Sequence, residues 1–393
     1  MSRTFYSLIM VILFLAVACV EPPETHVNHD QEALKLVWEI GYDAYVWGSY
    51  AAPTVFRDSL LIYSGDGGIH CVTVDSGRNK WTSSYLSAGF MHKAFVMDQA
   101  ALFGFSGKDK VFSIQLEDGS TLWETEIDSG RTFGYHTALN EDSYFIGTSS
   151  RNKRKTIWRL NKVNGTIMDS IITAYMPWGL FTKQGRLFNS NGWYPDNSPY
   201  FIGNIVCYDL PDMDTSWVYS TIGGGISSGN IVEENNILYA GTVWGGSLGN
   251  EIVALNAETG TRLWRTETYG CYQIVLDGDV LYYAGGSSVN ALDKNTGHVL
   301  WEAIIPTTDE SSPLAYWDGY VYKAHGGTLF IFDATTGERV HYTYTFNGNT
   351  EYVYQVSTGA GKIFVQTSQH LYAFEPFNPE ALSSNSGDAI LQI

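Results

Sequence analysis

Apolar and polar residues alternate along most of the chain in short runs that turn residues separate. The run Ala291–Trp301, ALDKNTGHVLW, begins as an alternating strand, passes through Asp-Lys-Asn-Thr-Gly and ends in a second strand. The run Ala254–Trp264, ALNAETGTRLW, keeps the same Ala, Leu, Thr-Gly, Leu and Trp at the same offsets. Alternation with period 2 is typical of strands with one buried face, and glycine between two such runs indicates a tight turn. The pattern predicts a β-hairpin that the chain repeats.

The tryptophan at the end of each hairpin marks the repeat. These anchor residues are Trp38, Trp81, Trp123, Trp217, Trp264 and Trp301, and Asp169 and His341 stand in the same register. Successive anchors are 37 to 48 residues apart, a spacing typical of propeller blades. Four residues before the anchor stands Gly77, Gly119, Gly165, Gly260, Gly297 or Gly337, and Met213 is the exception. A glycine there fits a turn position with positive φ.

Further strands lie upstream of each hairpin. An aromatic and aliphatic run such as NILYAGT or VLYYAGG precedes the hairpin, and a shorter run precedes that, so each repeat has four antiparallel strands. Ten residues before the anchor the side chain is usually small: Cys71, Ser113, Cys207, Ala254 or Ala291. Because Asp169 and His341 lack a large ring to bury, we expect the third and seventh blades to be packed less tightly.

The two ends of the repeat region complement each other. Residues 351–376 supply three strands without a fourth, and residues 34–40 supply a fourth strand without the other three. Joining them into one sheet closes a ring and leaves no exposed sheet edge. The sequence therefore predicts an all-β fold, an eight-bladed β-propeller of four-stranded antiparallel blades, whose N-terminal strand completes the last blade.

The N-terminal segment has the features of an export signal. Arg3 precedes the apolar run Leu8–Ala18, which is short for a membrane span. The run ends in Ala-Val-Ala-Cys, which resembles the lipobox of bacterial lipoproteins and implies lipidation of Cys19. The alternative is a plain secretory signal that is cut near Ala18. Val20 stands where an inner-membrane retention signal usually carries aspartate, which favours the outer membrane, on its periplasmic or its outer side.

These features divide the chain into four expected parts. We expect a lipoprotein signal peptide over 1–18, an acidic tether over 19–33, the propeller over 34–376 and a polar C-terminal tail over 377–393. The membrane would be contacted through the lipid anchor alone. We expect the propeller to be a monomer.

Charge excludes two classes of partner. The formal net charge is −18, from 41 acidic and 23 basic residues. Nucleic acids require a basic footprint, and anionic lipid headgroups attract basic segments. The sequence therefore predicts neither nucleic-acid binding nor electrostatic adhesion to a lipid surface.

The pattern Ala-Leu-Asp-x-x-Thr-Gly-x-x-x-Trp, nearly complete at 291–301 and 254–264, resembles the repeat of the PQQ-like (quinoprotein) β-propeller family. Two branches of that family imply different functions. One consists of dehydrogenases that oxidise alcohols or sugars with pyrroloquinoline quinone and Ca²⁺. The other is the BamB-like branch of non-enzymatic lipoproteins, which takes part in the assembly of β-barrel outer-membrane proteins.

The residues that the dehydrogenase branch requires are not found. Its members usually carry two adjacent cysteines in the cofactor pocket, whereas Cys71, Cys207 and Cys271 are far apart in the sequence. No local acidic cluster suggests the converging carboxylates of a calcium site. The resemblance therefore implies a non-catalytic scaffold, without cofactor or catalytic residue, that binds another envelope protein. A quinone- and calcium-dependent dehydrogenase and a surface module that binds carbohydrate or protein are the alternatives.

The three cysteines that remain after lipidation are expected to be free. Cys71 and Cys207 occupy the small-residue position of their repeats, in blades far apart in the ring. Such cysteines behave as small buried hydrophobic residues, so we expect no disulfide between them.

Residues of the innermost strands should line a central funnel. Aligning the repeats places one residue per blade there, including His92, His136, Trp178, Gln273 and Gln355. Two histidines are too few ligands for the metal sites that proteins usually build, so we expect no metal and a water-filled funnel lined by hydrogen-bonding groups.

Three neighbouring loops between second and third strands are long: 149–156, 191–204 and 242–250. They should lie side by side on the face that contains the funnel mouth. Their candidate partner-binding residues are Arg151, Arg154, Trp193, Tyr194, Tyr200 and Trp244, and Phe201 is expected to be exposed with them. Aromatic residues and arginine are enriched in interface hot spots. The alternative is that these aromatic side chains fold back and cap their own blades.

Overall fold

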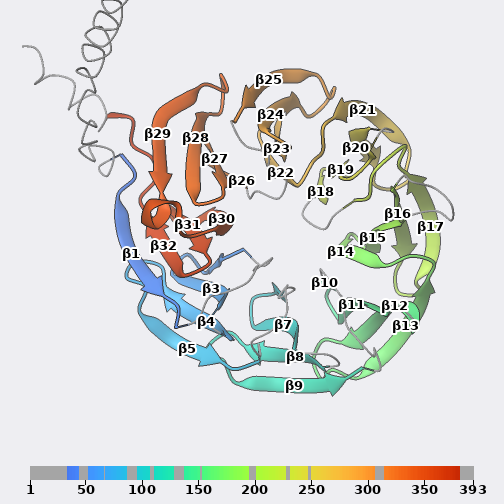
Figure 1. Ribbon diagram of the computed structural model, residues 1–393. Helices are drawn as coiled ribbons and strands as arrows, with labels where there is room; N and C mark the ends of the chain where they lie inside the picture. The colour runs from blue at the N-terminus through green and yellow to red at the C-terminus, as the bar shows by residue number, and fades with distance from the viewer. Residues whose placement is uncertain are drawn as a thin grey trace, which may run out of the picture.

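The computed structural model describes residues 33–43, 52–65, 67–85, 95–106, 110–127, 137–150, 153–193, 201–226, 231–246, 249–305 and 314–380. Eight four-stranded antiparallel sheets stand around a ring. Figure 1 shows strands such as β14 and β22 next to the centre, and β9, β13, β17 and β21 at the rim. The all-β eight-bladed propeller expected from the repeat is confirmed.

Within each blade the strands are adjacent in chain order, with one exception at the ring closure. Blades 1 and 2 contain β2 (Thr54–Phe56), β3 (Leu60–Gly65), β4 (Gly68–Thr73), β5 (Asn79–Ser83), β6 (Val96–Met97), β7 (Ala101–Ser106), β8 (Lys110–Gln115) and β9 (Thr121–Glu126). Blades 3 and 4 contain β10 (Thr137–Leu139), β11 (Ser143–Ser150), β12 (Lys153–Asn161), β13 (Ile167–Thr173), β14 (Pro177–Lys183), β15 (Arg186–Trp193), β16 (Ile202–Asp209) and β17 (Asp214–Ser220). Blades 5 and 6 contain β18 (Ile231–Glu234), β19 (Ile237–Gly241), β20 (Asn250–Asn256), β21 (Arg262–Thr268), β22 (Gln273–Asp277), β23 (Val280–Gly285), β24 (Ser288–Asp293) and β25 (Val299–Ile304). Blades 7 and 8 contain β26 (Leu314–Trp317), β27 (Tyr320–His325), β28 (Thr328–Asp333), β29 (Arg339–Thr345), the 3₁₀ turn η3 (Phe346–Asn349), β30 (Val353–Gly359), β31 (Lys362–Thr367), β32 (His370–Phe374) and β1 (Leu36–Gly41).

The ring is closed by the N-terminal strand. β1 pairs antiparallel with β32, with Trp38 opposite Ala373, and the eighth sheet has the order β1-β32-β31-β30. The packed region also reaches slightly beyond residues 34–376. Ala33 and Phe377 are both buried, and the Asn378 amide donates to the Ala33 carbonyl.

Each anchor tryptophan joins its blade to the next one. Trp81 Nε1 donates to the Leu116 carbonyl at 2.9 Å, and the Trp38, Trp123, Trp217, Trp264 and Trp301 indoles make the equivalent bond to the following blade. The ring lies against the glycine of that blade. A Cβ at Gly119, where φ is +74°, would come 2.7 Å from the Trp81 ring. The glycine is therefore required twice, by its turn and by the ring that covers it.

The small residue of each repeat lies opposite the tryptophan on the neighbouring strand. Cys71 pairs with Trp81, Ser113 with Trp123, Cys207 with Trp217, Ala254 with Trp264 and Ala291 with Trp301. Cross-strand neighbours on one sheet face compete for the same space. A small side chain is therefore the natural partner of the large ring.

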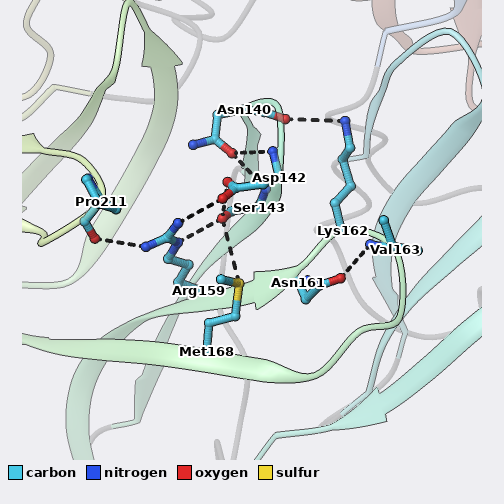
Figure 2. A network of polar contacts seen from close by, with 9 residues as sticks. All are labelled: Asn140, Asp142, Ser143, Arg159, Asn161, Lys162, Val163, Met168 and Pro211. Carbon is cyan, nitrogen blue, oxygen red and sulfur yellow. Dashed lines mark hydrogen bonds and ion pairs between the residues drawn. The ribbon is translucent and has the colours of Figure 1, made fainter.

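In blade 3 the two sizes are exchanged. The cross-strand pair is Arg159 and Asp169, and the glycine position of blade 4 holds Met213 at φ +59°. Figure 2 shows that the Arg159 side chain replaces the indole as the link between the blades. Its Nη1 donates to the Pro211 carbonyl at 2.8 Å, its Nε donates to Ser143 Oγ at 2.8 Å, and its Nη2 lies 3.2 Å from Asp142 Oδ2.

Blade 7, whose anchor position is His341, contacts blade 8 through an aromatic cluster. Phe346 of η3 is buried against Tyr344 and Tyr372, with ring centroids 4.8 and 5.0 Å apart. Leu34 is buried in the same cluster. Both irregular interfaces thus have substitutes for the tryptophan, and their looser packing stays a prediction.

Candidate binding site at the mouth of the channel

Three of the five predicted funnel residues lie in the described part of the chain. Trp178 is in β14, Gln273 begins β22 and Gln355 is in β30, and all three side chains are partly buried. Gln273 Oε1 accepts a hydrogen bond from the Leu314 amide at 2.9 Å and so links the inner strands of blades 6 and 7. His92 and His136 lie outside the described residues.

Trp178 belongs to an aromatic cluster that it forms with Phe201 and Trp244. Its ring stacks on Phe201 at 5.1 Å and meets Trp244 edge-on at 5.6 Å and 88°. Phe201 and Trp244 are 5.9 Å apart at 76°. These offset-stacked and perpendicular arrangements are the favourable ones for aromatic pairs. The cluster brings together an inner strand of blade 4 and the loop before β20 of blade 5.

Glycines make the room for this cluster. A Cβ at Gly225 would lie 2.1 Å from the Phe201 ring, and one at Gly192 would lie 2.5 Å from it. Phe201 is therefore 5% exposed, so the expectation that it lies on the surface is wrong. The ring fills a space that two glycines leave in the sheet and its neighbouring strand.

Trp244 is the exposed member of the cluster. Its side chain is 51% exposed and its backbone has φ +60°. A bulky residue rarely adopts this conformation, which costs about 1–3 kcal/mol and tends to occur at functional sites. The Gly245 amide donates to Asn250 Oδ1 at 2.8 Å and fixes the loop that follows Trp244. An exposed tryptophan held at this strain is the clearest mark of a binding surface in the described residues.

Trp193 follows the alternative and folds back. Its ring stacks on Tyr175 with centroids 3.6 Å apart and an interplanar angle of 12°. Lys155 Nζ lies 6.0 Å from the Tyr175 centroid on the edge of blade 3. The first long loop is also shorter than expected, because β11 extends to Ser150 and β12 begins at Lys153.

The other candidate loop residues cannot be placed. Arg151, Tyr194 and Tyr200 lie outside the described residues, and so does the side chain of Arg154, whose backbone is part of β12. Cys19 also lies outside them. Trp244 and Trp193 are thus the two predicted partner-binding residues that the structure places.

A buried ion pair between Glu251 and Arg265 joins β20 to β21, and the sequence analysis did not predict it. Glu251 is 1% exposed, and its carboxylate accepts a hydrogen bond from Arg265 Nε at 2.6 Å and one from the Ile222 amide at 3.2 Å. Burial raises the pKa of the neighbouring Tyr219, and the Glu251 charge raises it further. The sequence did contain a signal for this ion pair, because Glu251 is a charged residue at a buried position of the largely apolar strand β20.

A second buried carboxylate organises blade 8. Glu351 Oε1 accepts a hydrogen bond from the Tyr372 hydroxyl at 2.9 Å and lies 2.8 Å from His370 Nδ1. Thr367 and Asn347 donate to the same carboxylate. Burial and the Glu351 hydrogen bond raise the pKa of Tyr372 well above its usual range. Because both carboxylate oxygens are engaged in hydrogen bonds, the group joins η3 to β31 and β32.

The cysteines do not form a reactive site. Cys71, Cys207 and Cys271 are free and buried. Burial raises the pKa of the Cys71 thiol to about 11 and that of Cys207 to about 12. Thiols of this kind are protonated near neutral pH and are poor nucleophiles.

The donors for a calcium–quinone site do not converge. In the described residues, no group of three or more His, Cys, Asp and Glu side chains is arranged to hold a metal ion. Calcium requires several converging oxygen ligands, and no two cysteines are adjacent in the sequence. The residues in view therefore do not fit pyrroloquinoline quinone with Ca²⁺. No helix among them has the length and apolar character that a membrane crossing needs.

A match to a sequence family shows which family the chain belongs to. The sequence model described as "Outer membrane protein assembly factor BamB" matches residues 17–140 and 202–375, about three quarters of the chain. The chain belongs to this family. The family is that of PQQ-repeat β-propellers, in agreement with the repeat resemblance. None of the curated proteins compared with the chain matches it.

Solved structures share the fold at low sequence identity. BamB from Moraxella catarrhalis is 16% identical with a TM-score of 0.64, over 87% of this chain and 97% of that one. The quinohemoprotein alcohol dehydrogenase from Comamonas testosteroni is 10% identical with a TM-score of 0.64, over 89% and 78%. The computationally designed Ika8 protein is 14% identical with a TM-score of 0.62, over 86% and 100%. Because these structures include an enzyme and a designed protein, the likeness establishes the propeller alone.

The family match leaves out residues 141–201. This stretch carries β11–β15, including Arg159 and Asp169, where the regular tryptophan link is replaced. The matched residues therefore include one strand of blade 3 and two strands of blade 4.

Proposed function

We propose that the protein is a non-catalytic scaffold that binds another protein of the bacterial envelope. The observation that carries this proposal is Trp244, half exposed and strained, in contact with Trp178 of the inner strand β14. Tryptophan is enriched among the residues that dominate interface energies. Strained backbone conformations of this kind cluster at binding and active sites, so the positive φ of Trp244 supports a role in binding.

The cellular setting of the proposal comes from the family and from the N-terminal sequence. Family membership supports a role at the outer membrane, and the Ala-Val-Ala-Cys motif supports lipidation of Cys19. The most specific form of the proposal is a part in the assembly of β-barrel outer-membrane proteins. In that role the propeller would be a monomer, anchored by lipid, that offers its channel mouth to the assembly machinery.

Replacing Cys19 with serine should abolish labelling by a radioactive or clickable fatty acid and release the protein from membranes.

The binding role is tested with the lipid-free protein and the purified β-barrel assembly complex of the same organism. Trp244→Ala should weaken binding by roughly thirtyfold, the effect of a hot-spot residue worth about 2 kcal/mol. Leu263→Ala is a matched control, because Leu263 on β21 is also 51% exposed. It should leave the affinity unchanged. The proposal fails if the wild-type protein does not bind or if both variants bind equally well.

The dehydrogenase alternative is tested separately. Pyrroloquinoline quinone and Ca²⁺ are titrated against the protein while tryptophan fluorescence and dye-linked oxidation of alcohols and sugars are followed. We expect neither saturable quenching nor turnover. Saturable quenching together with turnover would replace the scaffold proposal with an enzymatic one.

A further inference from the structure

A cleft of about 410 Å³ lies between blades 3 and 4, and none of its lining residues belongs to the aromatic cluster of Trp178, Phe201 and Trp244. This volume is within the range of about 300–1,000 Å³ that small-molecule sites occupy. The outer strand β13 forms one wall, and β15, β16 and β17 form the other. The lining residues are Ile171, Ile172, Thr173, Ala174, Tyr175, Asn189, Asn191, Asn204, Val206, Tyr208, Met213, Asp214, Thr215 and Val218.

The exchange of anchor residues explains why space is left here. At the regular interfaces an indole fills the gap between the blades and covers a glycine. At this interface Asp169 is exposed and makes its hydrogen bond to the Ser170 amide. Arg159 reaches across to Pro211, and Met213 is part of the lining. No tryptophan is among the described residues that line the cleft.

The cleft presents three buried asparagines whose hydrogen-bonding capacity is only partly used. Asn189, Asn191 and Asn204 are 0%, 2% and 8% exposed. Among the described residues, Asn189 Oδ1 and Asn204 Oδ1 have no hydrogen-bond partner, whereas Asn191 Oδ1 accepts a hydrogen bond from the Asn204 backbone amide at 3.2 Å. Burial raises the pKa of Tyr208, and a side-chain hydrogen bond with Asn189 lowers it, so the Asn189 amide faces the Tyr208 hydroxyl. Buried polar groups are almost always hydrogen-bonded, so two unpaired amide oxygens at a cleft indicate a ligand that donates hydrogen bonds.

The chemistry of the walls selects the class of ligand. Asp214, exposed at the rim, is the one ionisable acid or base along the described lining apart from the tyrosines. Lys155 adjoins the cleft, where its Nζ donates to the Ala174 carbonyl at 3.2 Å. A lining without a cation of its own favours an uncharged ligand over a phosphate or a nucleotide. Each amide offers donors and an acceptor side by side, and each sugar hydroxyl also donates and accepts. Val206, Val218 and Ile171 supply apolar surface for the C–H face of a sugar ring.

We propose that the cleft between blades 3 and 4 binds a neutral mono- or disaccharide through Asn189, Asn191 and Asn204. The site is independent of the protein-binding surface at Trp244. Half of its lining residues, including Asn189 and Asn191, lie in residues 141–201, which the family match leaves out, and Asn204 lies in the matched part.

Tyr175 provides a built-in reporter. Its ring lines the cleft on one side and stacks on Trp193 on the other. A sugar in the cleft should therefore change the fluorescence of Trp193. Calorimetry and fluorescence are measured with the whole protein and a panel of glucose, galactose, mannose, N-acetylglucosamine, lactose, maltose and cellobiose.

The expected result is saturable binding of at least one of these sugars. The double variant Asn189→Leu, Asn191→Leu should weaken it by at least about tenfold, because leucine fills the volume but cannot hydrogen-bond. Asn290→Leu is the matched control, since Asn290 is a buried asparagine of blade 6 that already has a partner in Ser288. It should leave sugar binding unchanged, and so should Trp244→Ala.

A milder variant guards against misfolding of the double variant. Thr215→Val removes one hydroxyl from the exposed rim at nearly constant shape and should weaken binding severalfold.

The proposal is overturned if no sugar of the panel binds at millimolar concentration, or if the cleft variants bind as the wild type does. It is equally overturned if crystals soaked in the best sugar show only ordered water, or a peptide, at the three asparagines. Retained sugar binding with lost partner binding in Trp244→Ala would separate this site from the proposed function.

Discussion

At the scale of single residues, tryptophan and glycine form a pair across each regular blade interface. The glycine turn could be predicted from the repeat, because turns of this kind require positive φ. The indole that covers it could not, since the two residues belong to different repeats and meet only when the blades pack. Two glycines of this chain allow the need for a positive φ to be distinguished from the need for space under the indole. Gly119 has φ +74° and the Trp81 ring above it, whereas Gly185 has φ +74° and no atom within 4 Å of its Cβ direction.

Replacing each of these glycines with alanine should therefore have different effects. Both variants place alanine in the left-handed region, at about 1–2 kcal/mol. Gly119→Ala also forces a methyl group into the Trp81 ring and should lose about 1–3 kcal/mol more. Urea denaturation of the two variants measures this difference. Equal losses would show that the indole moves aside freely and does not hold the blades together.

The strain at Trp244 can be measured in the same way. Trp244→Gly and Trp244→Ala both remove the ring, but only glycine relieves the positive φ. The glycine variant should therefore be more stable than the alanine variant by about 1 kcal/mol in the free energy of unfolding. A glycine variant no more stable than the alanine one would remove the argument that strain is maintained here for binding.

At the scale of elements, the strands and their order could be predicted from the period of the sequence. The structure of the interface between blades 3 and 4 could not. Asp169 and Met213 break the pattern visibly, but the replacement by Arg159 depends on its register opposite Asp169. Likewise, Asn189, Asn191 and Asn204 come from two strands and look like ordinary polar positions until β15 and β16 pair. Phe201 was expected to be exposed because it lies in the long loop 191–204, and the sequence alone does not show that Gly192 and Gly225 leave room for its ring.

The Arg159 link should contribute measurably to stability. Arg159→Met keeps most of the apolar stem but removes the bonds to Pro211, Ser143 and Asp142, and should cost about 1.5–3 kcal/mol, the range for hydrogen bonds of charged groups. Lys35→Met breaks the exposed Lys35–Glu375 pair and is the control. Exposed pairs contribute about 0–1 kcal/mol. Equal effects in thermal or urea denaturation would contradict the account of blades 3 and 4.

Asp142 gives this link a dependence on pH. The Ser143 hydroxyl, and then the charge of Arg159, hold the pKa of Asp142 below its usual value of 3.8. A carboxyl whose pKa is lower in the folded than in the unfolded state stabilises the fold at pH values above the unfolded-state pKa. This contribution to stability is lost as the pH falls through the folded-state pKa. The stability difference between the wild type and Asp142→Asn should therefore be constant near neutral pH, decrease as the pH falls past about 3.8 and disappear below the lowered pKa of the folded state. In the Arg159→Met background this difference should be smaller near neutral pH. A difference that grows on acidification would reverse the sign of this argument.

At the scale of the whole molecule, the ring depends on a strand from the other end of the chain. Removing residues 33–41 takes away β1 and leaves β32 as an open edge. Such an edge promotes pairing with other chains, so the variant should unfold at lower temperature and aggregate. Removing residues 24–32, an equal length of the predicted tether, should leave the unfolding temperature unchanged. Scanning calorimetry with light scattering compares the two, and equal unfolding temperatures would mean that the ring does not need its closing strand.

The propeller brings residues from different repeats together, as Trp178 of blade 4 and Trp244 of blade 5 show. Binding of a partner would then depend on a few such residues.

The central claim, that Trp244 contacts a partner protein, is tested most directly by photocrosslinking in cells, with a photoreactive phenylalanine at position 244 and, as the control, at position 263. The account predicts an adduct with a β-barrel assembly protein at position 244 and none at position 263. The same adducts at both positions, or none at 244, would contradict it.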